Sequence, residues 1–173
     1  NRVIVSPIAG TTRDSIDTPF EKDGDRYMLI DTAGIRRKSK VTEDIERYSV
    51  IRAVAAIERS DVALLMIDAA EGITEQDKKI AGVAHEAGKG IIVVVNKWDL
   101  IAKETNTMRD FKRKIEAEFP FMTYAPSVFI SVKDHQRIDN VINMAKYVAE
   151  TRAMRVPTGQ LNALLQDAMM MKQ

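Results

Sequence analysis

The clearest chemistry in the sequence lies in four consecutive residues, Asn96, Lys97, Trp98 and Asp99, which directly follow a strongly apolar run. A carboxylate at Asp99 can accept two hydrogen bonds, from the N1–H and the exocyclic amine of a guanine base. Adenine has no matching pair of donors, and a buried polar group left without partners discriminates strongly between ligands. The Asn96 amide can brace the base and nearby loops, and the aliphatic part of Lys97 can cover the ring. The alternative is a plain strand-to-helix turn, which Asn and Asp also suit.

A second polar segment, Asp31-Thr32-Ala33-Gly34, follows another apolar run. A carboxylate at Asp31 can hold Mg²⁺ through water, and the Gly34 N–H can approach a terminal phosphate because no Cβ intervenes. A segment of this kind standing alone is usually an Asp/Gly turn. The Asn96 segment downstream favours the phosphate interpretation.

Two weaker candidates lie in other loop-like segments. Thr12, in a polar stretch over residues 10–14, can ligate Mg²⁺ and close over a γ-phosphate, with Thr11 as the second choice. A backbone N–H at Ser131 or Val132, after the last apolar run, can reach the O6 atom of guanine. Without the stronger motifs, these residues would be interpreted as a solvated loop and a turn.

The pattern of apolar residues predicts the elements that must position these segments. An Asp-Gly pair at residues 23–24 predicts a hairpin with arms at 18–22 and 26–30. Further strands are expected at 62–67, 91–95 and 127–131. Helices are expected at 43–59, 75–87, 106–119, 137–151 and 160–171. Strands that alternate with helices predict an α/β fold, with helices on both faces of a parallel sheet and ligands at the carboxyl ends of its strands.

Composition narrows the class of protein. The 173 residues carry 26 Lys and Arg against 25 Asp and Glu. This balance argues against a protein whose surface as a whole is covered by a polyanion. The chain has no cysteine, which excludes disulfides and thiolate sites. It has two histidines, and their positions lack the spacing of paired metal ligands. The longest apolar run is far short of the ~20 residues that span a bilayer. We expect a cytoplasmic globular protein with no membrane association.

Taken in order, the motifs resemble the G domain of translation-factor GTPases, and the residues between them narrow the match to the second G domain of the bacterial Der (EngA) family. The segments that carry the resemblance are Arg13-Asp14, residues 31–38, Glu46-Arg47-Tyr48-Ser49, residues 71–77 and residues 84–89. It covers nearly the whole chain. It implies a three-layer P-loop GTPase fold that binds and hydrolyses GTP and helps to assemble the large ribosomal subunit.

The resemblance also implies roles for the candidate residues. Guanine would be bound by Asn96, Lys97, Asp99, Ser131 and Val132. Thr12 and Asp31 would hold Mg²⁺, and Thr12, Asp31 and the Thr32-Ala33-Gly34 segment would act at the γ-phosphate, with K⁺ as a further ion. The implied partners are the large subunit or its rRNA, a first G domain and a KH-like domain. We expect residues 1–156 to form a partial G domain and residues 157–173 a helical extension toward the KH-like domain.

The sequence departs from the family in one important respect, because no G-x-x-x-x-G-K-[ST] phosphate loop occurs in it. In the family that loop and its strand precede the position of Asn1, so we expect the chain to be part of a longer protein. The absent strand would lie between the strands that end at Asp31 and Asp68. A smaller departure is Val132, where the family usually has Ala. Ile35 stands where a Gln could orient water, and the family shares this apolar residue. The alternative hypothesis is a nucleotide-free module that binds RNA or protein.

Overall fold

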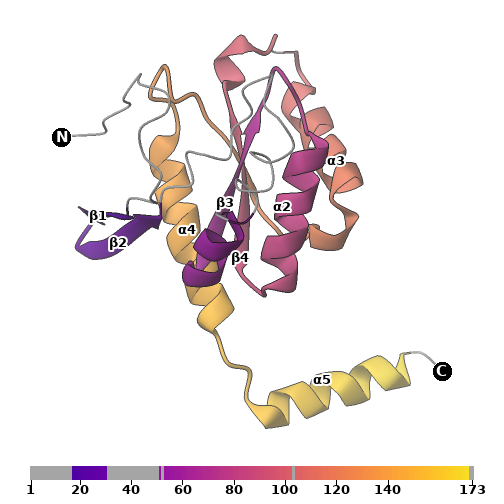
Figure 1. The fold of residues 1–173 in the computed structure, drawn as a ribbon. Coiled ribbons are helices and arrows are strands. Elements are labelled where there is room, and N and C mark those ends of the chain that lie inside the picture. Colours follow the sequence, from indigo (N-terminus) through magenta and orange to yellow (C-terminus); the bar gives the residue numbers. More distant parts are fainter. Residues whose placement is uncertain (1–16, 31–50, 52, 103, 172–173) are drawn as a thin grey trace.

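The computed structural model describes residues 17–30, 51, 53–102 and 104–171 (Figure 1). Its strands are β1 (Asp17–Lys22), β2 (Asp25–Ile30), β3 (Val62–Asp68), β4 (Gly90–Asn96) and β5 (Ser127–Phe129). Its helices are α2 (Glu75–Glu86), α3 (Thr107–Glu118), α4 (Ile138–Ala153) and α5 (Thr158–Met170), with short 3₁₀ helices η1 (Trp98–Leu100) and η2 (Pro120–Met122). Residues 53–59 are also helical, within the predicted 43–59 helix. The predicted elements in the described part are therefore confirmed, with small shifts at their ends.

Strands β1 and β2 form the predicted hairpin. Asp23 and Gly24, at its tip, both have positive φ angles, of 53° and 82°. Two consecutive positive φ angles are what a two-residue type I′ turn requires, and Asp-Gly meets this requirement at low steric cost. The rings of Phe20 and Tyr27 stack across the two strands with centroids 5.1 Å apart.

The hairpin is attached to α4 by two ion pairs, Lys22 with Asp139 and Lys146 with Asp25. Figure 1 shows β1 and β2 beside α4. Within the residues that the structure describes, β1 and β2 make a sheet of their own and β3, β4 and β5 make another. The expectation that an absent strand lies between β2 and β3 stays a prediction.

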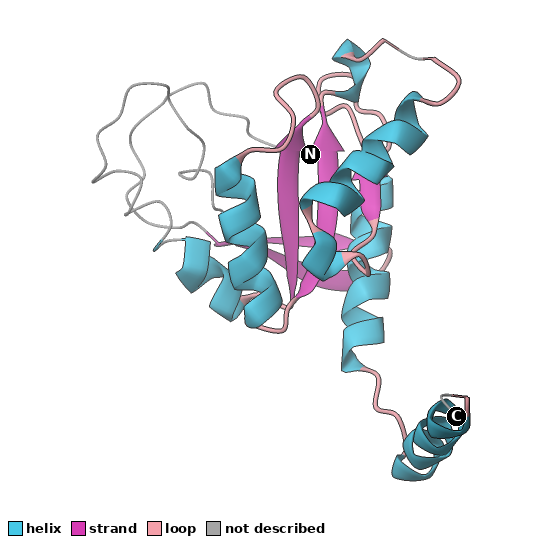
Figure 2. Cartoon of the chain, turned by 90° about the vertical axis from the view of Figure 1, so that its right-hand side faces the viewer, coloured by secondary structure: helices cyan, strands magenta, loops and turns pink. Residues whose placement is uncertain are grey.

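The parallel sheet has the order β3-β4-β5 and carries helices on both faces (Figure 2). Residues 91–95 of β4 are 0–1% exposed. Their side chains alternate between faces, so Ile91, Val93 and Val95 pack in the cluster that includes residues of α2 and α3. Ile92 and Val94 pack against α4 instead. The helix, sheet and helix layers confirm the predicted three-layer α/β class.

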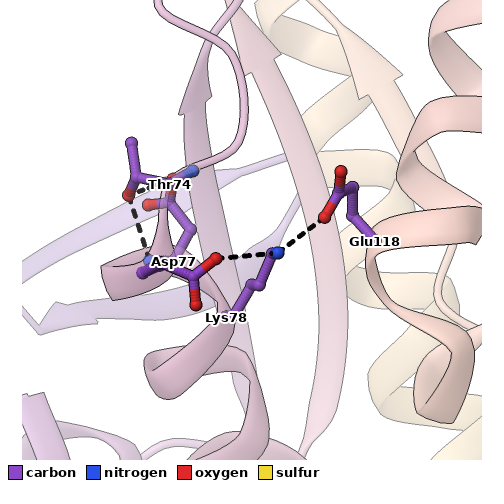
Figure 3. Close-up of polar contacts among 5 residues, drawn as sticks. Thr74, Asp77, Lys78 and Glu118 are labelled. Carbon is purple, nitrogen blue, oxygen red and sulfur yellow. Dashed lines mark hydrogen bonds and ion pairs between the residues drawn. The ribbon is translucent and has the colours of Figure 1, made fainter.

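Helix α2 is fixed at its start and tied to α3 (Figure 3). Thr74 Oγ1 accepts from the Asp77 N–H at 3.3 Å, and the Asp77 carboxylate accepts from the Thr74 N–H at 2.8 Å. This reciprocal capping box satisfies N–H groups that a helix start leaves unpaired. One turn on, the Lys78 ammonium bridges Glu75 at 2.9 Å and Glu118 of α3 at 2.6 Å.

Helix α5 differs from the other helices because none of its residues is buried. Figure 1 shows it projecting away from the sheet and its covering helices. It exposes several large apolar side chains, namely Leu161, Leu164, Leu165, Met169 and Met170. Among the described residues, no helix combines the length and apolarity needed to cross a membrane.

Candidate functional site

The strand register brings the candidate residues to one edge of the sheet. Asp68, the last residue of β3, is paired in register with Asn96, the last residue of β4. Phe129 of β5 is in register with Val95, so Ser131 follows at the same edge. Because all three strands are parallel, their carboxyl ends meet there, which is the usual ligand position in such sheets.

Asn96 joins the two candidate loops through one atom. Its Oδ1 atom accepts hydrogen bonds from the backbone N–H of Lys97 at 2.7 Å and of Val132 at 3.1 Å. The Asn96 segment and the Ser131 segment are thus held together, as the bracing role expected from the sequence requires. Within the described residues Asn96 Nδ2 forms no hydrogen bond, so this donor is available to a base.

Lys97 is held by its backbone and by its ammonium group. Its φ of 60° and ψ of 32° lie in the left-handed region, which lets the chain turn directly from β4 into η1. Its ammonium group pairs with the Asp68 carboxylate, which also accepts from the Ala70 N–H at 3.0 Å. The aliphatic part of Lys97 is thereby held at the edge of the sheet.

Burial raises the pKa of Asp68, but the hydrogen bond from Lys97, the N–H of Ala70 and the Lys97 charge outweigh this effect. The net result is a pKa below the ordinary value of 3.8. Asp68 is therefore a carboxylate at neutral pH. In the sequence, Asp68 stands out only as the end of a predicted strand; the signal for its role is that two polar strand ends are neighbours in a parallel sheet.

Trp98 anchors the turn that carries Asp99. Its side chain is 6% exposed and packs edge-on against Phe129 at 4.5 Å and Phe111 at 5.5 Å between ring centroids. Its backbone N–H donates to the Ile130 carbonyl at 3.1 Å. Trp98 therefore packs behind the motif. Asp99 is the next residue of the same 3₁₀ turn, and its Oδ1 atom is buried.

The Ser131 loop is closed by its own hydrogen bonds. Ser131 is 1% exposed; its N–H donates to the Gln136 carbonyl at 3.2 Å, and the Gln136 N–H returns to the Ser131 carbonyl at 2.9 Å. Ser131 Oγ accepts from the Asp134 N–H at 3.1 Å. The N–H groups of Ser131 and Val132 therefore both already donate to protein oxygens. A guanine O6 would share the Val132 N–H with Asn96 or replace Asn96 as its acceptor.

The candidates for the phosphate side lie outside the described residues. These are Thr12, Asp31, Thr32, Ala33 and Gly34. In the part of the chain that the structure describes, no group of three His, Cys, Asp or Glu side chains is arranged to hold a metal ion. The Mg²⁺ and K⁺ assignments stay predictions.

Sequence comparisons point to one group of proteins. The profile of a family described as "50S ribosome-binding GTPase" matches residues 1–97. A protein named GTPase Der from Alkaliphilus oremlandii is 58% identical over 99% of the chain, and one from Alkaliphilus metalliredigens is 59% identical over all of it. The chain spans 39% of the length of each of these relatives.

Solved structures give the same fold. An Era protein in complex with MgGDPNP and nucleotides 1506–1542 of 16S ribosomal RNA is similar with a TM-score of 0.66 and 29% identity. That match covers 89% of this chain and 49% of the Era chain. Aquifex aeolicus Era Y63A bound to GDP and AlF₄⁻ gives a TM-score of 0.65 at 29% identity, over 90% of this chain and 50% of the other.

Proposed function

The chain belongs to the Der family of GTPases, and from this premise we propose that it is the guanine-binding part of a protein that hydrolyses GTP. The observation that carries the proposal is the double hydrogen bond to Asn96 Oδ1, which joins the Asn96 loop to the Ser131 loop. Two loops held at the carboxyl edge of a parallel sheet form one site for one planar ligand. A plain strand-to-helix turn does not require a hydrogen bond from Asn96 to a second loop, so this contact favours a binding site over a turn.

Each residue of the joined loops has a role in this proposal. The Asp99 carboxylate accepts from the N1–H and exocyclic amine of guanine. The aliphatic part of Lys97, held by its ion pair with Asp68, covers one face of the ring. The N–H at Val132 meets the O6 atom, and the buried Ser131 keeps that loop in shape.

On the phosphate side, the proposal assigns Thr12 and Asp31 to Mg²⁺ and the Thr32-Ala33-Gly34 segment to the γ-phosphate. Bound Mg²⁺ would neutralise charge that develops on the phosphate oxygens, and K⁺ would add to this. The Gly34 N–H would approach the terminal phosphate closely because glycine has no Cβ. These assignments rest on the family resemblance.

The proposed cellular role is a switch in assembly of the large ribosomal subunit. The family description, "50S ribosome-binding GTPase", supports it. The similar Era structure contains 16S ribosomal RNA, which supports an RNA partner more generally. We further propose that residues 1–156 act as a G domain beside a first G domain, and that residues 157–173 lead toward a KH-like domain.

Exchange of Asp99 for Asn tests the base assignment. In the full-length protein, Asp99→Asn should weaken GDP binding by roughly 100-fold or more, because the amide offers a donor where the guanine amine needs an acceptor. Xanthosine diphosphate, which has a carbonyl at that position, should bind the variant better than GDP. Calorimetric titration with both nucleotides measures the switch.

The matched control is Asp167→Asn, on the exposed helix α5, which should bind GDP as the wild type does. Unchanged GDP preference in Asp99→Asn would overturn the base assignment.

GDP titration of the 173-residue chain alone addresses the alternative of a nucleotide-free module. We expect weak or undetectable binding there, because phosphate contacts contribute much of the affinity, and tight binding only in the full-length protein.

A further inference from the structure

Strand β5 lies at one edge of the parallel sheet (Figure 2). In the part of the chain that the structure describes, no strand pairs with its other side. The Val93 N–H donates to the Pro126 carbonyl at 2.9 Å, and the Ile130 N–H donates to the Val95 carbonyl at 2.8 Å. Since successive residues of a strand bond to opposite sides, the N–H and C=O groups of Ser127 and Phe129 face away from β4.

An open groove of about 690 Å³ runs along this free edge, between α3 and α4. Its floor includes Val128 and Phe129, both buried. One wall is formed by Met108 and Lys112, one turn apart on α3. The other wall is one face of α4, with the spacing of successive helical turns: Asn140, Asn143, Met144 and Tyr147. The groove therefore combines an apolar floor, amide side chains and backbone groups that no described strand pairs with.

The charge of the groove is of one sign. Lys112 and Arg137 are the charged residues that line it, and within the described residues neither takes part in an ion pair. No Asp or Glu lines it; Glu116 lines an adjoining small pocket that shares Lys112 and Ser127 with the groove. Both basic side chains are exposed, so an anionic partner would meet them without first displacing a protein carboxylate.

We infer that this groove binds a short extended segment of a partner protein that carries acidic side chains and pairs with β5 as an added strand. The backbone of such a segment would bond with Ser127 and Phe129. Its side chains would alternate between the α3 wall and the α4 wall, so an acidic one would meet Lys112 on one side or Arg137 on the other. Because β5 is only three residues long, it accommodates a single short segment and does not promote sheet-to-sheet aggregation.

A free strand edge favours a peptide over a nucleic acid. It presents N–H donors and C=O acceptors in alternation, and a peptide backbone matches both. The phosphate groups of RNA are acceptors only, so an RNA bound through its phosphates would satisfy the donors and leave the carbonyls unpaired. The two basic residues alone would suit either partner.

The test uses a blocked hexapeptide of alternating valine and glutamate, titrated into the ¹⁵N-labelled 173-residue chain. We expect the largest amide shift changes at Ser127 and Phe129, with saturation near or below about 1 mM peptide. A hexapeptide of alternating valine and lysine should leave these amides unchanged. Two N-methylated forms of the acidic peptide provide a further test, one methylated at the first, third and fifth residues and the other at the second, fourth and sixth. Only one of them should lose binding, because only one of these two sets of N–H groups faces β5.

Charge reversal of the groove supplies the second measurement. The double variant Lys112→Glu, Arg137→Glu should weaken binding of the acidic peptide at least tenfold. The matched control, Lys79→Glu with Arg155→Glu, changes the net charge equally at exposed positions outside the groove and should bind as the wild type does. The inference is overturned if the acidic peptide leaves Ser127 and Phe129 unshifted, if both N-methylated peptides bind, or if an octamer of uridylate shifts these amides while the peptide does not.

Discussion

Asn96 Oδ1 receives two backbone N–H groups, so removal of this side chain would leave both without their acceptor. We expect Asn96→Ala to lower the free energy of unfolding by about 1–3 kcal/mol, the usual cost of unsatisfied polar groups. Asn96→Asp should largely avoid this cost, because a carboxylate oxygen accepts the same two hydrogen bonds. Urea denaturation followed by Trp98 fluorescence measures the difference.

The same pair of variants separates the structural role of Asn96 from its role toward a ligand. Asn96→Asp lacks the amide donor, so the full-length protein should bind GDP at least tenfold more weakly while its stability is nearly kept. Equal losses of stability in the alanine and aspartate variants would contradict the described double hydrogen bond.

The pair formed by Asp68 and Lys97 predicts a pH dependence of stability. The pKa of Asp68 in the folded protein lies below 3.8, so the carboxylate favours the folded state above that pH. This contribution decreases as the pH falls from 3.8 through the folded pKa. Asp68→Asn should therefore be less stable than the wild type at pH 7, and the difference should shrink below pH 3.8.

Unfolding in urea at a series of pH values between about 2.5 and 7 tests this dependence. Asp167→Asn, on the exposed α5, is the control and should track the wild type at every pH. A stability difference between Asp68→Asn and wild type that stays constant across the series would refute the assigned ion pair.

At the scale of elements, we expect replacement of glycine by alanine to have opposite effects on stability at two positions. A Cβ on Gly90, at the start of β4, would lie 2.6 Å from Val148 Cγ1 of α4 and 3.2 Å from Val62 Cγ2. Gly90→Ala should cost about 1–3 kcal/mol of stability through overpacking between sheet and helix. Gly82, inside α2, has no atom within 4 Å of such a Cβ, so Gly82→Ala should stabilise the protein by about 0.5–1 kcal/mol.

Thermal unfolding of both variants and the wild type shows whether each substitution raises or lowers the stability. A stabilised Gly90→Ala would mean that α4 does not approach β4 as closely as described. The close approach explains why a glycine begins the most buried strand, where a β-branched residue would otherwise suit the sheet.

At the scale of the whole molecule, the exposure of α5 predicts that it contributes little to the stability of the rest. Removal of residues 157–173 should change the free energy of unfolding by no more than about 0.5 kcal/mol, because no residue of α5 is buried. Val141→Ala, in the buried face of α4, is the contrasting variant and should lose about 1–3 kcal/mol. If removal of α5 cost as much stability as Val141→Ala is expected to cost, α5 would have to pack against the sheet layers.

Much of the fold could be predicted from the sequence because its signals are local. The Asp-Gly pair at residues 23–24 indicates the hairpin, and the β-branched run at 91–95 indicates the central strand. Periodic apolar residues indicate the helices. The Asn96-to-Asp99 motif was recognisable because its residue types and spacing match one ligand chemistry. Trp98 could be assigned to packing since an indole beside a buried strand is covered more readily than exposed.

Only the tertiary structure decided which distant groups meet. Asn96 reaches Val132, 36 positions away, because β4 and β5 are parallel and end at the same edge. Lys97 finds Asp68 because the register pairs the last residues of β3 and β4. The groove beside β5 exists because α3 and α4 pack on opposite faces and leave the strand edge open between them. Such contacts depend on strand register and helix packing, which the pattern along a single segment does not contain.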